Sequence, residues 1–430
     1  MASQSQVELT SFDDHEASRQ DYQTLPPADT GRAAYSFLAA CFVMEALVWG
    51  FPFAFGVFQV YYTAQDQFAA QSNVIAAIGT TATGVMYFMG PVLAVLGQRW
   101  PRSRQPTMYV GLAIMIASLV IASFCTTVSG LLVTQGVMYA VGGVSLYFPV
   151  MQLVDEWFIT SKSKVRESGT GSAGIAIPFI MQALLDRYGY QTALRVWAVA
   201  ALCLALPCMP FLRPRLPVSA AGAFRPADWA FLKRPAFWLY ELGNVGQSLG
   251  YFLPGLYIPA YADSLGLPTY AGPLALGLYN IGFCAGTVGL GMIIDRYHVT
   301  NGILISTIGS LIAVFGFWGF TTTQPMLYMF AILYGMFGGS FSVTWSGCVG
   351  ALRQTDTNID AGLVIGLMAA GKGIGAVISG PLSAALLAAD TWRGHAGFAY
   401  GSGYGPLVVF SGVSAALGGT AWIGRQFRLI

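Results

Sequence analysis

The chain has 430 residues, of which 55% are hydrophobic, 14% aromatic and only 9% charged. Soluble globular domains carry about 25% charged residues, so this chain has too few charges to cover a water-facing surface. The composition excludes a soluble enzyme and a disordered regulator, and a net charge of +2 gives no basic surface for nucleic acid. A membrane protein with many spans remains.

The order of polar and apolar segments predicts a tail, two bundles and a linker. Residues 1–34 are polar and acidic, and we expect a disordered cytoplasmic tail without a cleaved signal peptide. Residues 213–235 are rich in Arg, Lys and Pro and predict a cytoplasmic linker between a six-helix bundle at 35–212 and another at 236–430. A spanning helix needs about 20 mostly apolar residues. Twelve stretches qualify: 35–60, 74–96, 108–126, 130–153, 167–185, 193–212, 236–261, 272–294, 302–320, 326–350, 362–388 and 402–424.

The distribution of basic residues predicts the orientation. Lys and Arg are enriched in the cytoplasmic loops of membrane proteins. With the N-terminus in the cytoplasm, 17 of the 21 Lys and Arg residues lie on that side, three lie outside and Lys372 lies within a span. We therefore expect an all-α membrane protein, with twelve transmembrane helices in two pseudo-symmetric bundles and both termini in the cytoplasm.

Two glycine-rich segments resemble nucleotide-binding motifs. Gly169–Gly174 matches G-x-G-x-x-G, but a dinucleotide site needs a preceding strand, and here the segment begins an apolar span. Gly366–Gly373 lacks the final Ser or Thr of a phosphate-binding loop. The His residues lie in the tail and loops, and the Cys residues form no C-x-x-C pair. We expect no cofactor, no metal and no enzymatic activity, with proton coupling left open.

Three charged residues fall inside predicted spans: Glu45, Glu241 and Lys372. A charge at the bilayer centre costs about 2.5–3.5 kcal/mol on insertion scales, which makes each a candidate for the substrate or proton pathway. Glu241 has an equally open alternative, because it lies near the cytoplasmic end of its helix and can extend towards the interface. Glu45 is the candidate proton carrier, and Lys372 the candidate for attracting an anionic group.

Polar stripes on two pseudo-equivalent helices predict a cavity between the bundles. On the first helix, at 100° per residue, one face carries Glu45, Trp49 and Gln59. On the seventh, one arc carries Glu241, Asn244, Ser248 and Tyr251. Three further residues are candidates by depth: Gln152, Asn280 and Trp345. The alternative for both stripes is hydrogen bonding between packed helices, worth about 0.6 kcal/mol each.

Several segments carry a family resemblance: Phe55–Tyr62 (F-G-V-F-Q-V-Y-Y), Gly142–Phe158, Gly169–Arg195, Arg213–Pro217 and Tyr251–Ala262. Together they resemble the monocarboxylate-porter branch of the major facilitator superfamily, particularly its fungal members. The resemblance covers nearly the whole chain beyond the tail. It implies a major facilitator fold, whose substrate site lies between two six-helix bundles.

The departures from this family bear on the substrate. Animal members that move lactate-like anions carry a Lys late in the first helix, where this chain has Phe53. They also carry an Asp and an Arg in the eighth helix, at positions that align with Phe283 and Thr287. The family's anion anchor is therefore missing from these positions.

The superfamily's loop motif predicts a conformational latch. It usually places Asp before Arg; the first half of this chain has Gln98-Arg99, whereas Asp295-Arg296 keeps the pair in the second half. The predicted latch residues are Arg99, Asp295 and Arg296.

We therefore predict a secondary active transporter that works by alternating access. Export of a small organic molecule, such as a fungal secondary metabolite, is favoured by the missing anion anchor and the aromatic-rich spans. Proton-coupled uptake of a monocarboxylate or related nutrient is the alternative, and a transporter-like membrane sensor is a remote third. The expected partners are the small-molecule substrate and the lipid bilayer, without nucleic acid. We expect a monomer in the plasma membrane.

Overall fold

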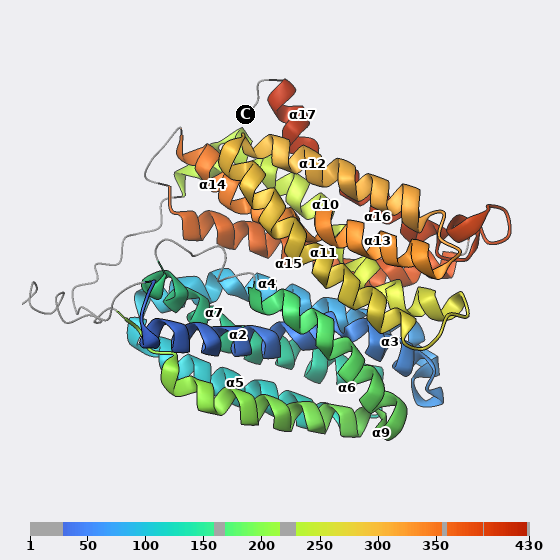
Figure 1. Cartoon of the computed structure of the whole chain (residues 1–430), viewed down its shortest axis with the longest axis horizontal. Helices are drawn as coiled ribbons and strands as arrows, with labels where there is room; N and C mark the ends of the chain where they lie inside the picture. The colour runs from blue at the N-terminus through green and yellow to red at the C-terminus, as the bar shows by residue number, and fades with distance from the viewer. Residues whose placement is uncertain (1–28, 159–167, 216–228, 355–358, 390, 428–430) are drawn as a thin grey trace, which may run out of the picture.

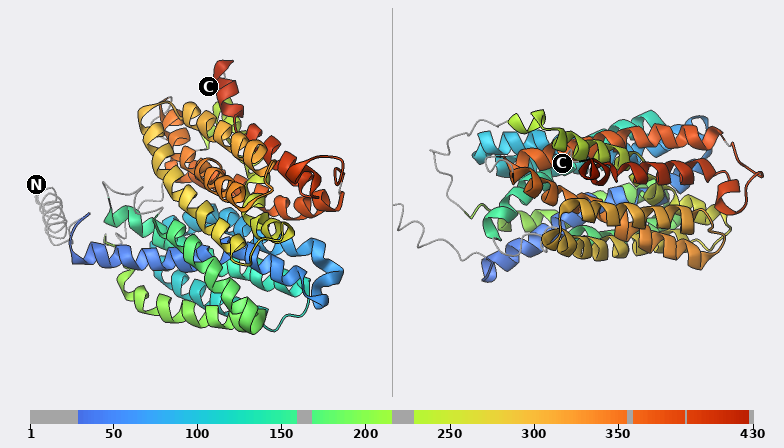
Figure 2. Two further views of the ribbon diagram at one scale, coloured as in Figure 1. Left: turned by 45° about the vertical axis from the view of Figure 1, so that its right-hand side comes forward. Right: turned by 90° about the horizontal axis from the view of Figure 1, so that it is seen from above.

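The computed structural model describes residues 29–158, 168–215, 229–354, 359–389 and 391–427. In these ranges every regular element is a helix. Two bundles lie side by side with their helices along a common direction, the first blue to green and the second yellow to red (Figures 1 and 2). The predicted tail up to residue 28, the basic residues Lys162, Lys164 and Arg166, and residues 216–228 of the predicted linker lie outside the described residues.

The first bundle contains the following elements in chain order: α2 (Arg32–Phe53), α3 (Phe55–Thr63), η1 (Asp66–Val74), α4 (Ile75–Arg99), η2 (Pro101–Ser103), α5 (Arg104–Ala122), α6 (Val128–Leu131), η3 (Leu132–Met138), α7 (Tyr139–Trp157), α9 (Ser168–Cys208) and η4 (Met209–Phe211). We call the end of the molecule where α2 begins the linker end. The end that contains η1 is the opposite end.

The second bundle contains these elements: η5 (Ala230–Lys233), α10 (Pro235–Ser264), α11 (Ala271–Arg296), α12 (Val299–Leu311), η6 (Ile312–Trp318), α13 (Gln324–Phe337), η7 (Gly339–Val343), α14 (Thr344–Arg353), α15 (Ala361–Ala389), η8 (Phe398–Gly401), α16 (Gly405–Leu417) and α17 (Thr420–Gln426).

The structure matches the twelve predicted spans when one long candidate is divided into two helices and α10 is added. Ten helices in the described residues are long and apolar enough to cross a membrane. One of these, Gly174–Phe211, is two helices joined at Gly189, whose φ of 77° reverses the chain and is a conformation that glycine adopts without strain. The 30-residue α10 is the remaining span, and it carries the polar residues Asn244, Gln247 and Ser248.

Among the described spans, the first and the tenth contain breaks at depth. The first span breaks at Ala54, between α2 and α3 and two residues after Pro52, because a proline inside a helix removes one backbone hydrogen bond. The tenth span passes through the 3₁₀ segment η7 between α13 and α14. Backbone groups freed at such breaks are tolerated at membrane depth only where protein or a cavity satisfies them.

Glycines allow the closest helix contacts, both within and between the bundles. Inside the second bundle, the backbone of α13 lies directly on Gly282 and Gly286 of α11. Between the bundles, Gly84 of α4 faces Gly373 of α15. The helices α4 and α15 lie side by side (Figure 1). The described interface also includes contacts of α3 with α10, of α9 with α11 and of η1 with α15. Small residues permit such approach where apolar side chains alone give no driving force in lipid.

Candidate functional site

Lys372 lies at the interface between the bundles, inside a group of aromatic rings. Its side chain comes from α15, and the residue is only 1% exposed. The Nζ atom lies 3.9 Å from the ring centroid of Tyr251, 5.4 Å from Tyr87, 5.7 Å from Trp345 and 5.8 Å from Phe252. Nζ also donates a hydrogen bond of 2.6 Å to the Ser342 hydroxyl. We call these four rings the lysine cage.

The cage combines both bundles. Tyr87 belongs to α4 of the first bundle, whereas Tyr251, Phe252 and Trp345 belong to the second. A cation over an aromatic face is attracted by the ring quadrupole, by about 2 kcal/mol or more where water is excluded. The rings therefore stabilise a charge that burial alone would penalise.

Asn244 fixes the position of Trp345 in the cage. The Trp345 indole nitrogen donates to Asn244 Oδ1 at 3.0 Å, and Asn244 Nδ2 donates to the Met368 carbonyl at 2.6 Å. Met368 lies one turn before Lys372 on α15, so a single buried amide on α10 links α14 to α15. Ser248 follows one turn later on α10 and donates back to the Asn244 carbonyl at 2.6 Å.

Trp49 continues the aromatic cluster into the first bundle. Its ring centroid lies 5.2 Å from that of Tyr87 and 5.7 Å from those of Phe53 and Tyr147. Because Tyr87 contacts both Trp49 and Lys372, the first-helix stripe and the second bundle meet at this ring. Trp49, Asn244, Tyr251, Trp345 and Lys372, which the sequence puts forward separately, thus occupy one continuous cluster.

A cavity of about 50 Å³ lies beside the cage, at the break in the first span. It is lined by residues of both bundles: Pro52, Phe53, Phe55, Gly56, Gly79, Thr80, Thr83, Tyr251, Phe252, Gly255, Leu256, Leu276, Tyr279 and Asn280. Drug-sized ligands occupy roughly 300–1,000 Å³, so in this conformation the bundles leave room only for a few waters. Tyr251 and Phe252 both line the cavity and belong to the cage.

Asn280 and Gln59 lie where the bundles touch. Asn280 Nδ2 donates to the Gly174 carbonyl of α9 at 3.1 Å and to the Leu276 carbonyl of its own helix at 2.8 Å. A side chain at Gly174 would collide with this amide, so the glycine motif at 169–174 includes a close helix contact. Gln59 is buried on α3 and interacts with the Tyr257 hydroxyl of α10.

Three other candidates belong neither to the aromatic cluster nor to the cavity lining. Glu45 is buried on α2, with 2% exposure. Glu241 lies on α10 one turn before Asn244, with its carboxylate against Gly371 of α15. Gln152 lies at the linker end of α7, beside Gly97 of α4.

The predicted latch residues are exposed at the linker end. Arg99 packs over the Trp100 ring, 5.5 Å from its centroid. Asp295 and Arg296 end α11 with exposed side chains, and the described part of the chain gives them no ion pair with each other or with Arg99.

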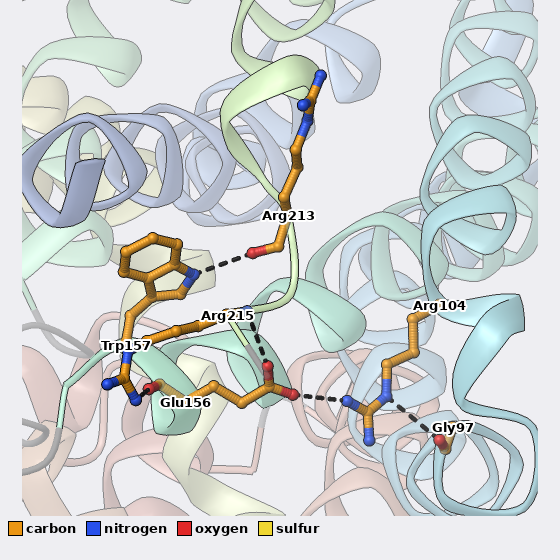
Figure 3. Close-up of polar contacts among 6 residues, drawn as sticks. All are labelled: Gly97, Arg104, Glu156, Trp157, Arg213 and Arg215. Atoms are coloured by element: carbon orange, nitrogen blue, oxygen red, sulfur yellow. Dashed lines mark hydrogen bonds and ion pairs between the residues drawn. The ribbon is translucent and has the colours of Figure 1, made fainter. Parts of the chain in front are cut away.

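An ion network that the sequence did not single out joins helices of the first bundle (Figure 3). Arg104 donates to Glu156 Oε1 at 2.9 Å and to the Gly97 carbonyl at 3.2 Å. The Arg215 backbone amide donates to Glu156 Oε2 at 3.1 Å. The Trp157 indole donates to the Arg213 carbonyl at 2.9 Å. The sequence signal that could have predicted this network is Glu156, an acidic residue at the end of a span between two basic loops.

The glycine-rich Gly366–Gly373 is part of a continuous helix, α15. Gly373 contacts the Gly84 carbonyl, and Gly366 contacts Pro91 of α4. Its glycines therefore serve packing between the bundles.

Comparisons with known proteins agree with this architecture. The family model described as Major Facilitator Superfamily matches residues 37–358. Among solved structures, the nucleoside transporter NupG has a TM-score of 0.69 at 14% identity and covers 92% of this chain and 100% of its own. This likeness shows the fold.

Relatives among curated proteins are fungal transporters. The MFS-type transporter pynF of Aspergillus niger is 25% identical over 88% of this chain and 87% of its own length. The fujikurins efflux protein of Gibberella fujikuroi is 25% identical, with 93% of this chain and 84% of that protein covered. The aspyridones efflux protein apdF of Emericella nidulans is 24% identical over 84% and 73%. None of these names tests the monocarboxylate-porter resemblance, which stays a prediction. The family match, covering more than half of the chain, shows that this multi-pass membrane protein belongs to the Major Facilitator Superfamily.

Proposed function

We propose that the chain exports a small organic secondary metabolite by alternating access, and that it is a carrier without enzymatic activity. The observation that carries the proposal is the aromatic cluster around Lys372, which residues of both bundles form beside a small cavity. Relatives named as efflux proteins for fujikurins and aspyridones support the direction. Large ring faces suit organic products better than small hydrophilic nutrients.

Alternating access fits the interface between the bundles. In the described residues the most extensive contacts between them join α4 with α15, α9 with α11 and α3 with α10; η1 also contacts α15, and α4 contacts α10. Rocking one bundle against the other would break these contacts in turn and open the cavity to each side. We further propose a plasma-membrane location with both termini in the cytoplasm, supported by the 17 to 3 distribution of basic residues.

The experiment is deletion of the gene in its own host, followed by untargeted metabolite comparison of cells and medium. We expect at least one organic product to accumulate in cells and to decrease in the medium. Reintroduction of the wild-type chain should restore export, and so should Lys233→Met, which removes an exposed lysine at the linker end. An unchanged distribution of every product would refute the proposal.

Proton-coupled uptake of a monocarboxylate or related nutrient is a second candidate. The specific observation that favours it is Glu45, a carboxyl group buried in α2, since intramembrane carboxyl groups commonly relay protons in transporters. In proteoliposomes under an imposed pH gradient, Glu45→Gln should abolish gradient-driven transport. Undiminished transport by this variant would exclude Glu45 as the proton carrier.

A further inference from the structure

The side chain of Lys372 places an ammonium group in a buried aromatic environment. A lysine stem alone would pack as well as methionine, yet the chain keeps an ammonium group here at 1% exposure. A charged side chain at membrane depth is costly and is commonly functional. The ammonium donates a hydrogen bond to the Ser342 hydroxyl. Ser342 lies in the 3₁₀ segment η7, at the break in the tenth span.

The cage and the adjacent Trp49 also have a defined shape. Within the cage, the rings of Tyr87 and Trp345 lie at 82° to each other, and the neighbouring Trp49 lies at 48° to Tyr87. The two indoles are anchored differently: Trp345 by the Asn244 amide and Trp49 by packing against Tyr147 and Phe53. A planar conjugated body can stack on such faces at a low cost in conformational entropy.

The cavity and the cage share two rings. Tyr251 and Phe252 line the cavity, and their ring centroids lie 3.9 Å and 5.8 Å from Lys372 Nζ. A ligand in the cavity would therefore contact two rings that also contact the ammonium. Since Tyr87 belongs to the opposite bundle, a ligand that reaches Lys372 contacts both bundles at once.

We propose that Lys372 and Ser342 bind the acidic group of an organic anion whose planar conjugated body packs on Trp49, Tyr87 and Trp345. This inference rests on the proposed transport function and specifies its substrate class. It locates the anion site in the eleventh span, whereas the family resemblance would place an anchor at Phe53, Phe283 and Thr287, which carry no charge. The proposed site therefore requires a ligand that has both a planar conjugated body and a negative charge.

The test is calorimetric binding to the purified full-length protein in lipid nanodiscs at pH 8. Three probes separate the two requirements. 2-Naphthoate has both the planar ring system and the negative charge, 2-naphthamide has the ring system alone, and acetate has the charge alone. A hydrogen bond to a charged group contributes about 1.5–3 kcal/mol, so we expect 2-naphthoate to bind about ten- to hundredfold more tightly than 2-naphthamide. Acetate should bind more weakly than both.

Variants assign the preference to Lys372. Lys372→Met should remove the preference for 2-naphthoate over 2-naphthamide, and Lys372→Arg should retain part of it. Lys233→Met is the matched control and should bind all three probes as the wild type does. Thermal unfolding of each variant checks folding; if Lys372→Met does not fold, Ser342→Ala takes its place and should weaken 2-naphthoate binding alone.

Equal binding of 2-naphthoate and 2-naphthamide to the wild type would overturn the inference. So would a preference that survives Lys372→Met in a folded protein, because Lys372 would then be structural. Either result leaves export itself standing if the deletion strain retains a product. Conversely, an unchanged deletion strain with the binding preference intact would overturn the export function and leave the anion site standing.

Discussion

The contact between Gly84 and Gly373 offers the sharpest test of alternating access. A Cβ atom added at Gly84 would lie 2.5 Å from Val377 Cγ2, 2.9 Å from the Gly373 carbonyl oxygen and 3.0 Å from the Val377 nitrogen. Carbon atoms in contact normally lie about 3.5–4.0 Å apart. Two of the three obstacles are backbone atoms, which cannot rotate aside. Gly84→Ala therefore requires α4 and α15 to separate.

The magnitude follows from the cost of overpacking, which is about 1–3 kcal/mol. This cost falls only on the conformation in which α4 and α15 are in contact, whereas the better helix propensity of Ala, about 1 kcal/mol, applies to every conformation. The equilibrium should shift away from the conformation described here by roughly 5- to 150-fold. Transport should decrease strongly without loss of folding.

The assay is a distance measurement between spin labels across the opposite end, at Gln67 of η1 and Ala388 of α15, in a variant without the native cysteines. Both positions are exposed, and η1 packs against α15 in this conformation. The wild type should show a short-distance population, which Gly84→Ala converts to longer distances.

Two matched glycines serve as controls. A Cβ atom at Gly289 of α11 meets no atom within 4 Å, so Gly289→Ala should leave both distances and transport unchanged. A Cβ atom at Gly286 collides with the Met336 carbonyl inside the second bundle, so Gly286→Ala should lower thermal stability instead. A Gly84→Ala protein with wild-type distances and wild-type transport would refute the reasoning.

Three other predictions concern stability. Glu156→Gln removes the ion pair with Arg104, whose side chain is 21% exposed; with this partial exposure we expect a loss of about 1 kcal/mol in the free energy of unfolding, and a smaller effect in an Arg104→Ala background. Trp345→Phe leaves the buried Asn244 oxygen unpaired and should cost about 1–3 kcal/mol; adding Asn244→Leu should recover part of this, and strict additivity would contradict the geometry. Burial lowers the pKa of His298, which caps α12 by accepting a backbone hydrogen bond. A lowered pKa favours the neutral form in the folded state, so this contribution is present above pH 6.5 and lost as the pH falls through the folded pKa. Melting curves of His298→Asn should show less acid destabilisation than those of the wild type, and identical curves would exclude this role.

Local composition was sufficient to predict where the spans lie, because a helix that crosses a bilayer needs an apolar run of about 20 residues. The same reasoning placed Glu45 and Lys372 at membrane depth, where the structure finds both buried. It also placed Asn244 and Ser248 on one arc of α10, since helix geometry relates residues one turn apart. It did not predict the 3₁₀ segment at Gly339–Val343.

The sequence by itself determined the helical fold, the positions of the spans and the presence of Glu45, Asn244, Ser248 and Lys372 within them. Only the tertiary structure decided that Lys372 meets Tyr87 and Trp345, that Asn280 reaches Gly174, and that Glu156 pairs with Arg104. The physical reason is that hydropathy and helical period fix depth and face within one helix. Which faces meet depends on close packing between helices hundreds of residues apart, decided by glycine contacts such as Gly84 with Gly373 that no local pattern reveals.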